Sequence, residues 1–511
     1  MPDATTMDAL VRSRAAAHGD KPAVIDPGTR ISYAALEASS RELAAILVQA
    51  GVGKGTRVGL IMPNGVDWVR TAVAVTRIGA VLVPLSTLLT PPELRAQLRV
   101  AAVQFLIGVE EFRGRRYLDG LYAAPALDLP ALQHVWSTRR LASAPAGAGP
   151  ARVLDALAAS VTPSDPMLIM FTSGSSGPPK GVLHSHGSAL GAVASGLAAR
   201  CIDADTRLYL PMPFFWVGGF GGGVLSALLA GATLITEEIP KPETTLGLLE
   251  SERVTLFRGW PDQAQALARH SGTTDLSALR PGSLEALLPP ALRAEPGARA
   301  NLFGMTESFG PYCGYAADTD LPRSAWGSCG KPFEGMEVRI VYLETAVPVP
   351  TGMIGMIQLR GPHILRGICG RTREATFTAD GYYPTGDLGR LDHDGFLYYH
   401  GRSDDMFKVS GATVYPGEVE KALLAIDGVT AAFVTNVPDG EQARVGAAVA
   451  GDALTIGQLH ERARALLSAF KVPTVWLLVA GPDAIPRGPT GKVDTRRLQE
   501  MLANQQRRER I

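Results

Sequence analysis

Short apolar segments alternate with longer amphipathic segments along this chain, and this alternation restricts its fold more than any other feature. Runs of strand length lie at Arg57–Met62, Ala80–Pro84 and Val103–Leu106, and helical patterns lie between them at Val66–Ile78 and Pro91–Val100. Such alternation favours parallel pairing, because a parallel connection needs a crossover and a helix usually supplies it. The pattern therefore predicts parallel-rich sheets covered by helices.

The pattern changes farther along the chain. Ala316–Lys331 is rich in loop residues and precedes three shorter strand patterns, at Glu337–Tyr342, Met356–Arg360 and Phe396–His400, which predict a small β unit. After Arg402 the expected order is helix, strand, strand and helix, at Pro416–Ala425, Val429–Asn436, Arg444–Ala450 and Thr455–Phe470. A segment of this kind could fold alone.

The chain of 511 residues is too long for one hydrophobic core, which predicts at least two domains. The predicted fold class is α/β, with a large N-terminal domain at residues 1–402, a boundary at residues 403–404 and a small α+β C-terminal domain at residues 405–511. Within the first domain, Arg139–Pro150 is rich in alanine, glycine and proline and is expected to be a loop.

Composition and charge exclude several classes of protein. Hydrophobic residues make up 46% and charged residues 19%, which is typical of a globular chain rather than a disordered one. Lysine plus arginine and aspartate plus glutamate number 49 each, so no net field favours nucleic acid or an anionic membrane. The start lacks a signal-peptide pattern, and the four cysteines are widely spaced. We therefore expect a cytoplasmic protein with reduced thiols and no zinc site.

One segment is long enough to cross a membrane. Leu208–Thr236 contains no charged residue, but Pro211, Pro213 and several glycines interrupt it. Proline and adjacent glycines break a continuous helix. A buried turn and helix that line a pocket are therefore expected here, rather than a transmembrane segment.

A loop rich in serine and glycine follows an apolar strand in Met167–Gly181, which reads MLIMFTSGSSGPPKG. Glycines and hydroxyl residues allow backbone N–H groups and hydroxyls to surround phosphate oxygens, and a lysine adds positive charge. The spacing is not the Walker pattern, because two prolines separate the last loop glycine from the lysine. A flexible linker is the plain alternative. The predicted phosphate-binding residues are Thr172, Ser173, Gly174, Ser175, Ser176, Gly177 and Lys180.

This loop resembles the phosphate loop of the adenylate-forming superfamily of acyl-CoA synthetases, peptide-synthetase adenylation domains and luciferases. Further motifs of that family follow in order over nearly the whole chain: FGMTE at Phe303–Glu307, YYPTGD at Tyr382–Asp387, GRSDDMFKVSGATVYPGEVE at Gly401–Glu420 and GPTGK at Gly488–Lys492. The resemblance implies activation of a carboxylic acid by ATP and transfer of the acyl group to coenzyme A.

The resemblance also implies roles in nucleotide binding. Glu307 stands where the family binds Mg²⁺, and Thr306 supplies a hydroxyl near the phosphates. Phe303 occupies the place of an aromatic ring that stacks on adenine. Asp387 resembles the carboxylate that accepts hydrogen bonds from both ribose hydroxyls, and Arg402 an arginine that contacts the nucleotide. Without the other motifs, Glu307 would be interpreted as part of a helix cap and Asp387 as part of a turn.

A mobile C-terminal domain is implied as well. Lys492 resembles the lysine that bridges the carboxylate and the α-phosphate, which stabilises charge during adenylate formation. Asp404 corresponds to the hinge about which the small domain rotates. In the second orientation the segment Lys408–Gly411 replaces Lys492, and Gly411 lines the tunnel for the pantetheine arm of coenzyme A.

The expected acid site is apolar. The segment PMPFFWVGGF lacks the aspartate with which peptide-synthetase domains bind an amino group, so an amino acid is not the expected substrate. Trp216 stands where many acyl-CoA synthetases have a histidine that gates the acyl pocket. The predicted lining residues are Phe214, Phe215, Trp216, Val217, Gly218, Gly219, Gly304, Met305 and Phe309. Fatty, aryl and terpenoid acids all remain open.

Two departures and three alternatives remain. The family's glycine-rich adenine loop is reduced to LRPGSLEALLPP, and its GExGE turn reads GMIGM at Gly352–Met356. The absence of a long insertion between the large-domain motifs favours coenzyme A over a carrier protein as acceptor. A carrier-protein ligase, a binding protein without turnover and a luciferase-like oxygenase are the alternatives. No nucleic-acid partner is expected.

Overall fold

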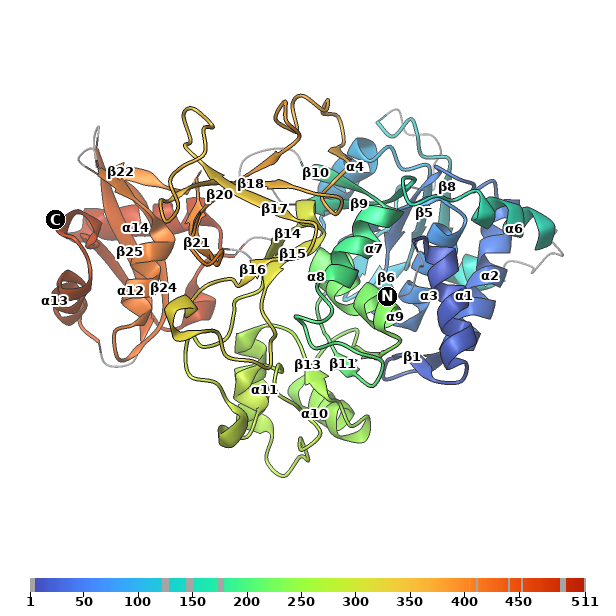
Figure 1. Cartoon of the computed structure of the whole chain (residues 1–511), viewed down its shortest axis with the longest axis horizontal. Coiled ribbons are helices and arrows are strands. Elements are labelled where there is room, and N and C mark those ends of the chain that lie inside the picture. The colour runs from blue at the N-terminus through green and yellow to red at the C-terminus, as the bar shows by residue number, and fades with distance from the viewer. Residues whose placement is uncertain are drawn as a thin grey trace. The chain divides into compact units, whose positions relative to one another are not determined.

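The protein is described by a computed structural model that covers residues 5–121, 128–143, 151–172, 179–403, 405–409, 412–439, 442–451, 454–487 and 493–509. The chain divides into two compact units (Figure 1). The first consists of Met1–Glu337 and Leu359–Tyr383, and the second of Val338–Gln358 and Pro384–Ile511. Residues 384–402 thus belong to the same compact unit as the residues that follow them. The domain boundary at residues 403–404 stays a prediction.

A seven-stranded sheet forms the centre of the first unit. Its order is β19-β10-β9-β4-β3-β5-β8. The strands from β9 to β8 pair in parallel, and β10 pairs antiparallel with both β9 and β19. The bounds are β3 Arg57–Ile61, β4 Val81–Leu85, β5 Phe105–Gly108, β8 His134–Ser137, β9 Pro166–Thr172, β10 Lys180–Ser185 and β19 Gly367–Ile368. The predicted parallel-rich sheet is confirmed.

A second sheet of the first unit has the order β13-β11-β12-β1-β2. Its strands β13, β11, β12 and β1 pair in parallel, and β2 pairs antiparallel with β1. The bounds are β1 Pro22–Ile25, β2 Arg30–Ser32, β11 Arg207–Tyr209, β12 Thr233–Ile235 and β13 Leu256–Phe257. Because β11 and β13 are parallel neighbours, the segments that follow them both begin at the carboxyl ends of these strands.

Helices and aromatic packing complete this unit. Trp68 is fully buried and meets Phe214 and Phe220 edge-on, at 5.2 and 5.3 Å between ring centroids. Edge-to-face rings add to the stabilisation from burial. The helices are α1 Met7–His18, α2 Tyr33–Gln49, α3 Val66–Arg77, α4 Pro91–Val100, α5 Thr138–Ser143, α6 Ala151–Ala159, α7 His186–Ser195, α9 Ser226–Ala230, α10 Pro242–Ser251 and α11 Pro261–His270.

The prediction of a loop at Arg139–Pro150 is wrong for its first part. Thr138–Ser143 is helical, and the hydroxyl of Ser137 accepts a hydrogen bond from the backbone N–H of Arg140 at 3.2 Å. A serine hydroxyl in this position satisfies a free N–H of the first turn and so favours a helix. Residues 144–150 lie outside the described residues.

The uncharged segment Leu208–Thr236 folds into several short elements. Strand β11 leads into a short turn of α8, Val217–Gly219, a π-helix at Phe220–Leu225, helix α9 and strand β12. Among the described residues, no helix is both long enough and apolar enough to cross a membrane.

A small antiparallel sheet carries the FGMTE motif. Its order is β14-β15-β16, with bounds Phe303–Met305, Gly310–Gly314 and Lys331–Pro332. A 3₁₀ turn at Thr306–Ser308 joins the first two strands. The motif therefore lies on a tight hairpin whose turn presents Thr306 and Glu307.

A two-stranded antiparallel sheet of β6 Glu111–Phe112 and β7 Arg115–Arg116 also belongs to the first unit. The second unit contains most of two further sheets. One has the order β17-β18-β20-β21, with bounds Glu337–Val341, Gly355–Arg360, Tyr383–Leu391 and Leu397–Arg402. The other has the order β24-β25-β26, with bounds Val429–Asp439, Gln442–Gly451 and Val475–Val479. A hairpin of β22 Phe407–Val409 and β23 Ala412–Val414 and the helices α12 Pro416–Leu424, α13 Ile456–Leu466 and α14 Thr495–Glu509 complete the unit.

Candidate active site

The strands on either side of the predicted phosphate loop hold its ends together. Strand β9 ends at Thr172, strand β10 begins at Lys180, and these two residues pair directly across the antiparallel ladder. Both side chains are half-buried. The ladder thus brings two of the predicted phosphate-binding residues face to face at the mouth of the loop. The predicted residues between them, Ser173–Gly177, lie outside the described residues.

The carboxylate of Glu307 is buried on the turn of the FGMTE hairpin. Only 6% of the residue is exposed, and the hydroxyl of Tyr383 donates a hydrogen bond to its Oε1 at 3.1 Å. The backbone oxygen of Glu307 accepts from the N–H of Leu365 at 2.7 Å. A buried carboxylate needs such partners or a cation. Sequence reasoning missed Tyr383, which lies far from Glu307 along the chain.

His184 ties strand β10 to the same turn. Its Nε2 lies 2.8 Å from the backbone oxygen of Thr306, and its Nδ1 lies 3.4 Å from the hydroxyl of Ser188. A carbonyl oxygen only accepts, so Nε2 carries the proton. Burial lowers the pKa of His184 to about 4, which keeps the ring neutral. A residue of β10, the strand that follows the phosphate loop, therefore fixes the turn that carries Glu307.

One carboxylate is a suitable protein contribution to a magnesium site. Mg²⁺ usually keeps water ligands and binds through one or two carboxylates together with substrate phosphates. Within the described residues, no group of three histidine, cysteine, aspartate or glutamate side chains could hold a metal alone. The buried carboxylate of Glu307 fits such a contribution, and its role as a magnesium ligand stays a prediction.

Glycine is required at position 304 by the close approach of two strands. A Cβ atom there would lie 2.0 Å from the backbone oxygen of Gly310. The ring of Phe303, predicted to stack on adenine, meets Tyr312 edge-on at 5.6 Å. The absence of a side chain at Gly304 thus has a structural cause, which holds whether or not the residue lines an acid pocket.

The predicted acid-binding residues divide into core residues and surface residues. Phe214 and Phe309 are 0% and 1% exposed and pack in the hydrophobic core. Phe215 is also buried, but its ring meets the partly exposed Trp216 at 5.3 Å. Trp216 in turn meets Trp260 edge-on at 6.2 Å. Trp216, rather than Phe214 or Phe309, is therefore accessible to a substrate.

Trp260 is an accessible aromatic residue that sequence reasoning missed. It precedes helix α11 and is 39% exposed. Trp216 and Trp260 follow β11 and β13, whose parallel register pairs Tyr209 with Phe257. Ligands commonly bind outside the carboxyl ends of parallel strands. The one sequence signal for Trp260 was its place shortly after the apolar pair Leu256–Phe257.

In the second unit, Asp387 and Arg402 form a hydrogen-bonded ion pair. They are opposite each other in the β20–β21 ladder, and Nη1 of Arg402 lies 3.2 Å from Oδ1 of Asp387. The same nitrogen donates to the backbone oxygen of Thr385 at 2.9 Å. Asp387 is 6% exposed. The structure thus places together the two residues predicted to bind the ribose and the nucleotide.

Several predicted residues cannot be placed. Asp404 of the hinge, Gly411 of the coenzyme A tunnel and the catalytic Lys492 lie outside the described residues, as do the central residues of the phosphate loop. Their roles stay predictions.

Comparisons with known proteins agree with the family that the sequence motifs resemble. Residues 11–369 match the family described as AMP-binding enzyme. A 3-(7a-methyl-1,5-dioxo-octahydro-1H-inden-4-yl)propanoyl:CoA ligase of Mycobacterium tuberculosis is 33% identical over 518 residues, with 97% of this chain and 98% of that protein covered. A feruloyl-CoA synthase of an Amycolatopsis species is 32% identical over 494 residues, with 94% and 96% covered.

A solved structure has the same fold. The crystal structure of ATP-bound MatB from Rhodopseudomonas palustris has a TM-score of 0.80 at 25% identity, over 98% of this chain and 99% of its own. The chain therefore belongs to the AMP-binding enzyme family, on the acyl-CoA synthetase branch of the adenylate-forming superfamily that its motifs resemble.

Proposed function

We propose that this protein joins a carboxylic acid to ATP as an acyl-adenylate and then passes the acyl group to coenzyme A. The observation that carries the proposal is the hydrogen bond from His184 to the backbone of Thr306. It connects the strand that leaves the phosphate loop to the turn that holds Glu307. This contact holds two motifs that are far apart in the sequence next to each other, which supports a shared site.

The first half-reaction joins two anions. A carboxylate oxygen of the acid attacks the α-phosphorus of ATP, the bond to the β-phosphate oxygen breaks, and pyrophosphate leaves with the bonding electrons. Positive charge lowers the repulsion between the reactants, and Lys180 at the mouth of the loop supplies some of it. When Mg²⁺ is bound, with Glu307 as its protein ligand, it neutralises the phosphate oxygens. Asp387 and Arg402 are proposed to hold the ribose.

In the second half-reaction the thiol sulfur of coenzyme A attacks the acyl carbonyl. The bond between the carbonyl carbon and the phosphate oxygen breaks, AMP leaves, and the thiol proton is lost to solvent. We propose that residues 405–511 rotate about Asp404 between the two steps. Lys492→Ala should then abolish adenylate formation and largely spare thioester formation from a supplied acyl-adenylate. An equal loss in both single-turnover assays would contradict this rotation.

The acid is proposed to be apolar and cyclic. The accessible indole rings of Trp216 and Trp260 meet edge-on and offer flat apolar faces beside the strand ends. No acidic residue lies in the segment between Pro211 and Phe220, so an amino group would lack a counter-charge there. The two relatives described above are named for a bicyclic propanoyl group and for feruloyl, which are both cyclic acids.

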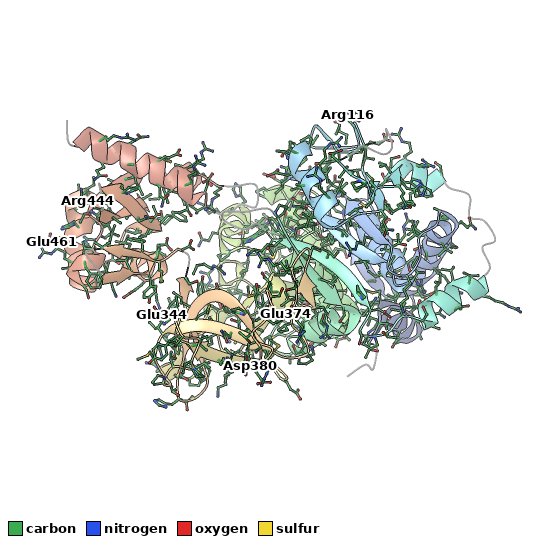
Figure 2. The ribbon with its side chains drawn as sticks, turned by 90° about the horizontal axis from the view of Figure 1, so that it is seen from above. Arg116, Glu344, Glu374, Asp380, Arg444 and Glu461 are labelled. Atoms are coloured by element: carbon green, nitrogen blue, oxygen red, sulfur yellow. The ribbon has the colours of Figure 1, made fainter. Side chains whose placement is uncertain are left out.

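The test is a panel of aryl, polycyclic and straight-chain acids with ATP, Mg²⁺ and either coenzyme A or a carrier protein with a phosphopantetheine thiol. Pyrophosphate release and mass spectrometry report the two half-reactions. We expect acyl-CoA products and the highest kcat/KM for cyclic acids. Glu307→Gln should abolish pyrophosphate release, whereas Glu461→Gln, an exposed change on α13 (Figure 2), should not. No pyrophosphate release with any acid would refute the proposal.

A further inference from the structure

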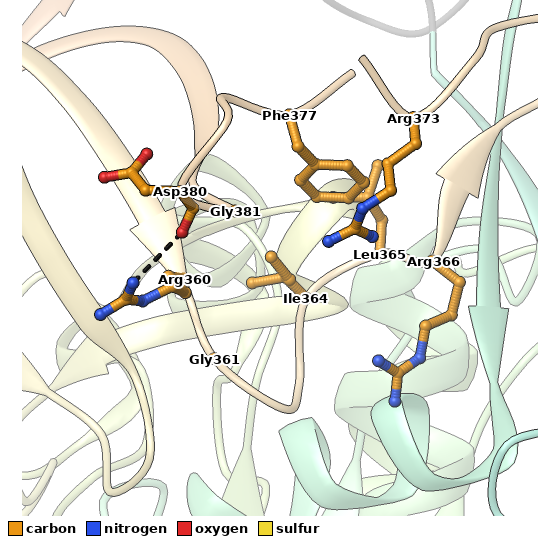
Figure 3. Close-up of a pocket in the computed structure, with 9 residues that line it drawn as sticks. All are labelled: Arg360, Gly361, Ile364, Leu365, Arg366, Arg373, Phe377, Asp380 and Gly381. Atoms are coloured by element: carbon orange, nitrogen blue, oxygen red, sulfur yellow. Dashed lines mark hydrogen bonds between the residues drawn. The ribbon is translucent and has the colours of Figure 1, made fainter. Parts of the chain in front are cut away.

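A pocket of about 340 Å³ lies within the first unit, in the segment Arg360–Gly381 (Figure 3). None of the residues predicted to bind nucleotide, acid or coenzyme A lines it. Its volume is near the lower end of the range of about 300–1,000 Å³ that small-molecule sites occupy. The lining residues are Arg360, Gly361, Ile364, Leu365, Arg366, Arg373, Phe377, Asp380 and Gly381.

One part of the pocket is apolar. Ile364, Leu365 and Phe377 are 5%, 1% and 8% exposed, so they form a firmly packed surface rather than loose side chains. Figure 3 shows the ring of Phe377 and the side chain of Ile364 on the pocket lining. This surface suits a ring or a short alkyl group.

The charged residues of the pocket differ in the ion pairs and hydrogen bonds that they form. Arg360 is already neutralised, because its Nε and Nη2 donate to Glu337 at 3.0 and 2.5 Å and its Nη1 donates to the backbone oxygen of Asp380. The carboxylate of Asp380 accepts from the hydroxyl of Thr378 at 2.6 Å. Figure 3 shows that carboxylate on the side away from Arg373. Arg360 and Asp380 therefore have partners and need no ligand.

Arg366 and Arg373 lack such partners. Within the part of the chain that the structure describes, neither takes part in a salt bridge. Nε of Arg366 donates to the hydroxyl of Ser185 at 3.2 Å, and neither terminal nitrogen forms a hydrogen bond with another described residue. The guanidinium of Arg373 lies 5.0 Å from the ring centre of Phe377 (Figure 3). Stacking uses the face of a guanidinium and leaves its N–H edge available.

We propose that this pocket is a second ligand site, which binds a small organic oxyanion with an apolar group. The oxyanion, a carboxylate or a phosphate monoester, would accept hydrogen bonds from Arg366 and Arg373, whose planar forks match both groups. The apolar group would lie on Phe377, Leu365 and Ile364. The two sources of the shared chemistry are organic acids of the kind the enzyme activates and phosphate esters.

The floor of this pocket is joined to the residues that hold Glu307. The N–H of Leu365 donates to the backbone oxygen of Glu307 at 2.7 Å. The ring of Phe377 lies 6.2 Å from that of Tyr383, whose hydroxyl donates to the Glu307 carboxylate. A ligand that contacts Leu365 and Phe377 would thus act on the backbone hydrogen bond of Glu307 directly and on its hydrogen bond from Tyr383 through the ring of Phe377. Two sites that share such contacts affect each other's affinities reciprocally.

Calorimetry on the full chain tests the proposal with four probes: benzoate, phenyl phosphate, inorganic phosphate and the neutral analogue benzamide. We expect benzoate or phenyl phosphate to bind, benzamide not to bind at millimolar concentration, and inorganic phosphate to bind more weakly than phenyl phosphate. Arg373→Ala should weaken binding about tenfold, as expected for the loss of a charge-assisted hydrogen bond. The matched control is Arg371→Ala, an exposed arginine outside the pocket lining, which should change the affinity less than twofold.

A third variant separates this site from the proposed acid site. Trp216→Ala alters the acid site and should leave the Arg373-dependent binding unchanged. Since binding is measured without turnover, the result does not depend on the proposed reaction. Tighter binding of benzoate would identify organic acids as the ligand class, and tighter binding of phenyl phosphate would identify phosphate esters. The proposal fails if neither anion binds, if Arg371→Ala matches Arg373→Ala, or if all binding disappears in Trp216→Ala.

Discussion

Tyr383 donates its phenolic hydrogen to Oε1 of Glu307 at 3.1 Å, and both side chains are buried. A carboxylate that is to bind a cation must keep one oxygen free, and this hydrogen bond fixes the orientation of the group. If Glu307 binds Mg²⁺ as proposed, Tyr383 is a positioning residue for it.

Replacing Tyr383 with phenylalanine removes the hydroxyl that donates to Glu307 and keeps the ring. We expect Tyr383→Phe to raise the Mg²⁺ concentration needed for half-maximal adenylation about tenfold, in the range seen for residues that orient metal ligands. The matched control is Tyr382→Phe, which removes a hydrogen bond to Oε2 of the exposed Glu337 at 2.9 Å. Magnesium titrations at saturating ATP measure both variants. An equal shift in the two would assign Tyr383 a merely structural role.

The ion pair of Asp387 and Arg402 holds the carboxylate that is proposed to bind the ribose of ATP. If Asp387 accepts hydrogen bonds from the ribose hydroxyls, Asp387→Asn should lower kcat/KM for ATP about a hundredfold, the effect of losing about 2.7 kcal/mol of binding. Steady-state kinetics with varied ATP measure it. Asp394→Asn, an exposed change on the β20–β21 turn, should leave the ATP dependence within twofold of the parent. Unchanged kinetics in Asp387→Asn would remove Asp387 from the nucleotide site.

Alanine variants of two glycines with similar backbone angles can distinguish the effect of backbone strain from the effect of a clash with Arg402. Gly386 and Gly395 have φ of 75° and 81°, so alanine at either position costs about 1–2 kcal/mol. A Cβ at Gly386 would lie 2.8 Å from Nη2 of Arg402, whereas one at Gly395 meets nothing within 4 Å. Both alanine variants should therefore lower the Tm. Only Gly386→Ala should also raise KM for ATP, and an increase in both would point to general disorder of the β20–β21 hairpin.

How much of this molecule could be predicted depended on how local each interaction is. Helix α4 has the predicted bounds, because Thr90 and Glu93 form a capping box and Pro91 begins the first turn, all within four residues. The pairing of Asp387 with Arg402 likewise joins two motifs that were visible in the sequence. Local patterns thus predicted elements such as α4 and two motif residues that the structure shows as neighbours.

The missed residues act over long distances in the chain. Tyr383 reaches Glu307 from 76 residues away, and His184 reaches Thr306 from 122 residues away. No periodicity or spacing encodes such contacts, because they depend on how sheets and loops pack. Trp260 was missed for the same reason, since its partner Trp216 follows a different strand.

Acid should destabilise the protein through two buried histidines. Burial lowers the pKa of His184 and of His186 to about 4. The hydrogen bond to the Thr306 carbonyl opposes this lowering at His184, and the charge of Arg366 adds to it. At His186 the carboxylate of Asp165 opposes the lowering, and the charge of Lys54 adds to it. The unfolded chain binds these protons near pH 6.5, and the folded chain does not. Stability is therefore fully present above pH 6.5 and falls as the pH drops toward 4, by about 1.4 kcal/mol per pH unit for each histidine.

A variant of His184 allows a direct measurement of this effect. His184→Gln keeps a donor for the Thr306 carbonyl but cannot take up a proton in this range. Between pH 6.5 and 4.5 its Tm should fall less steeply than that of the parent, by the contribution of one proton. His270→Gln is the control, because His270 is exposed and, among the described residues, its ring forms a hydrogen bond only with a carbonyl of its own helix. Parallel Tm curves for His184→Gln and the parent would show that His184 is already protonated in the folded state, contrary to the neutral ring proposed for this site.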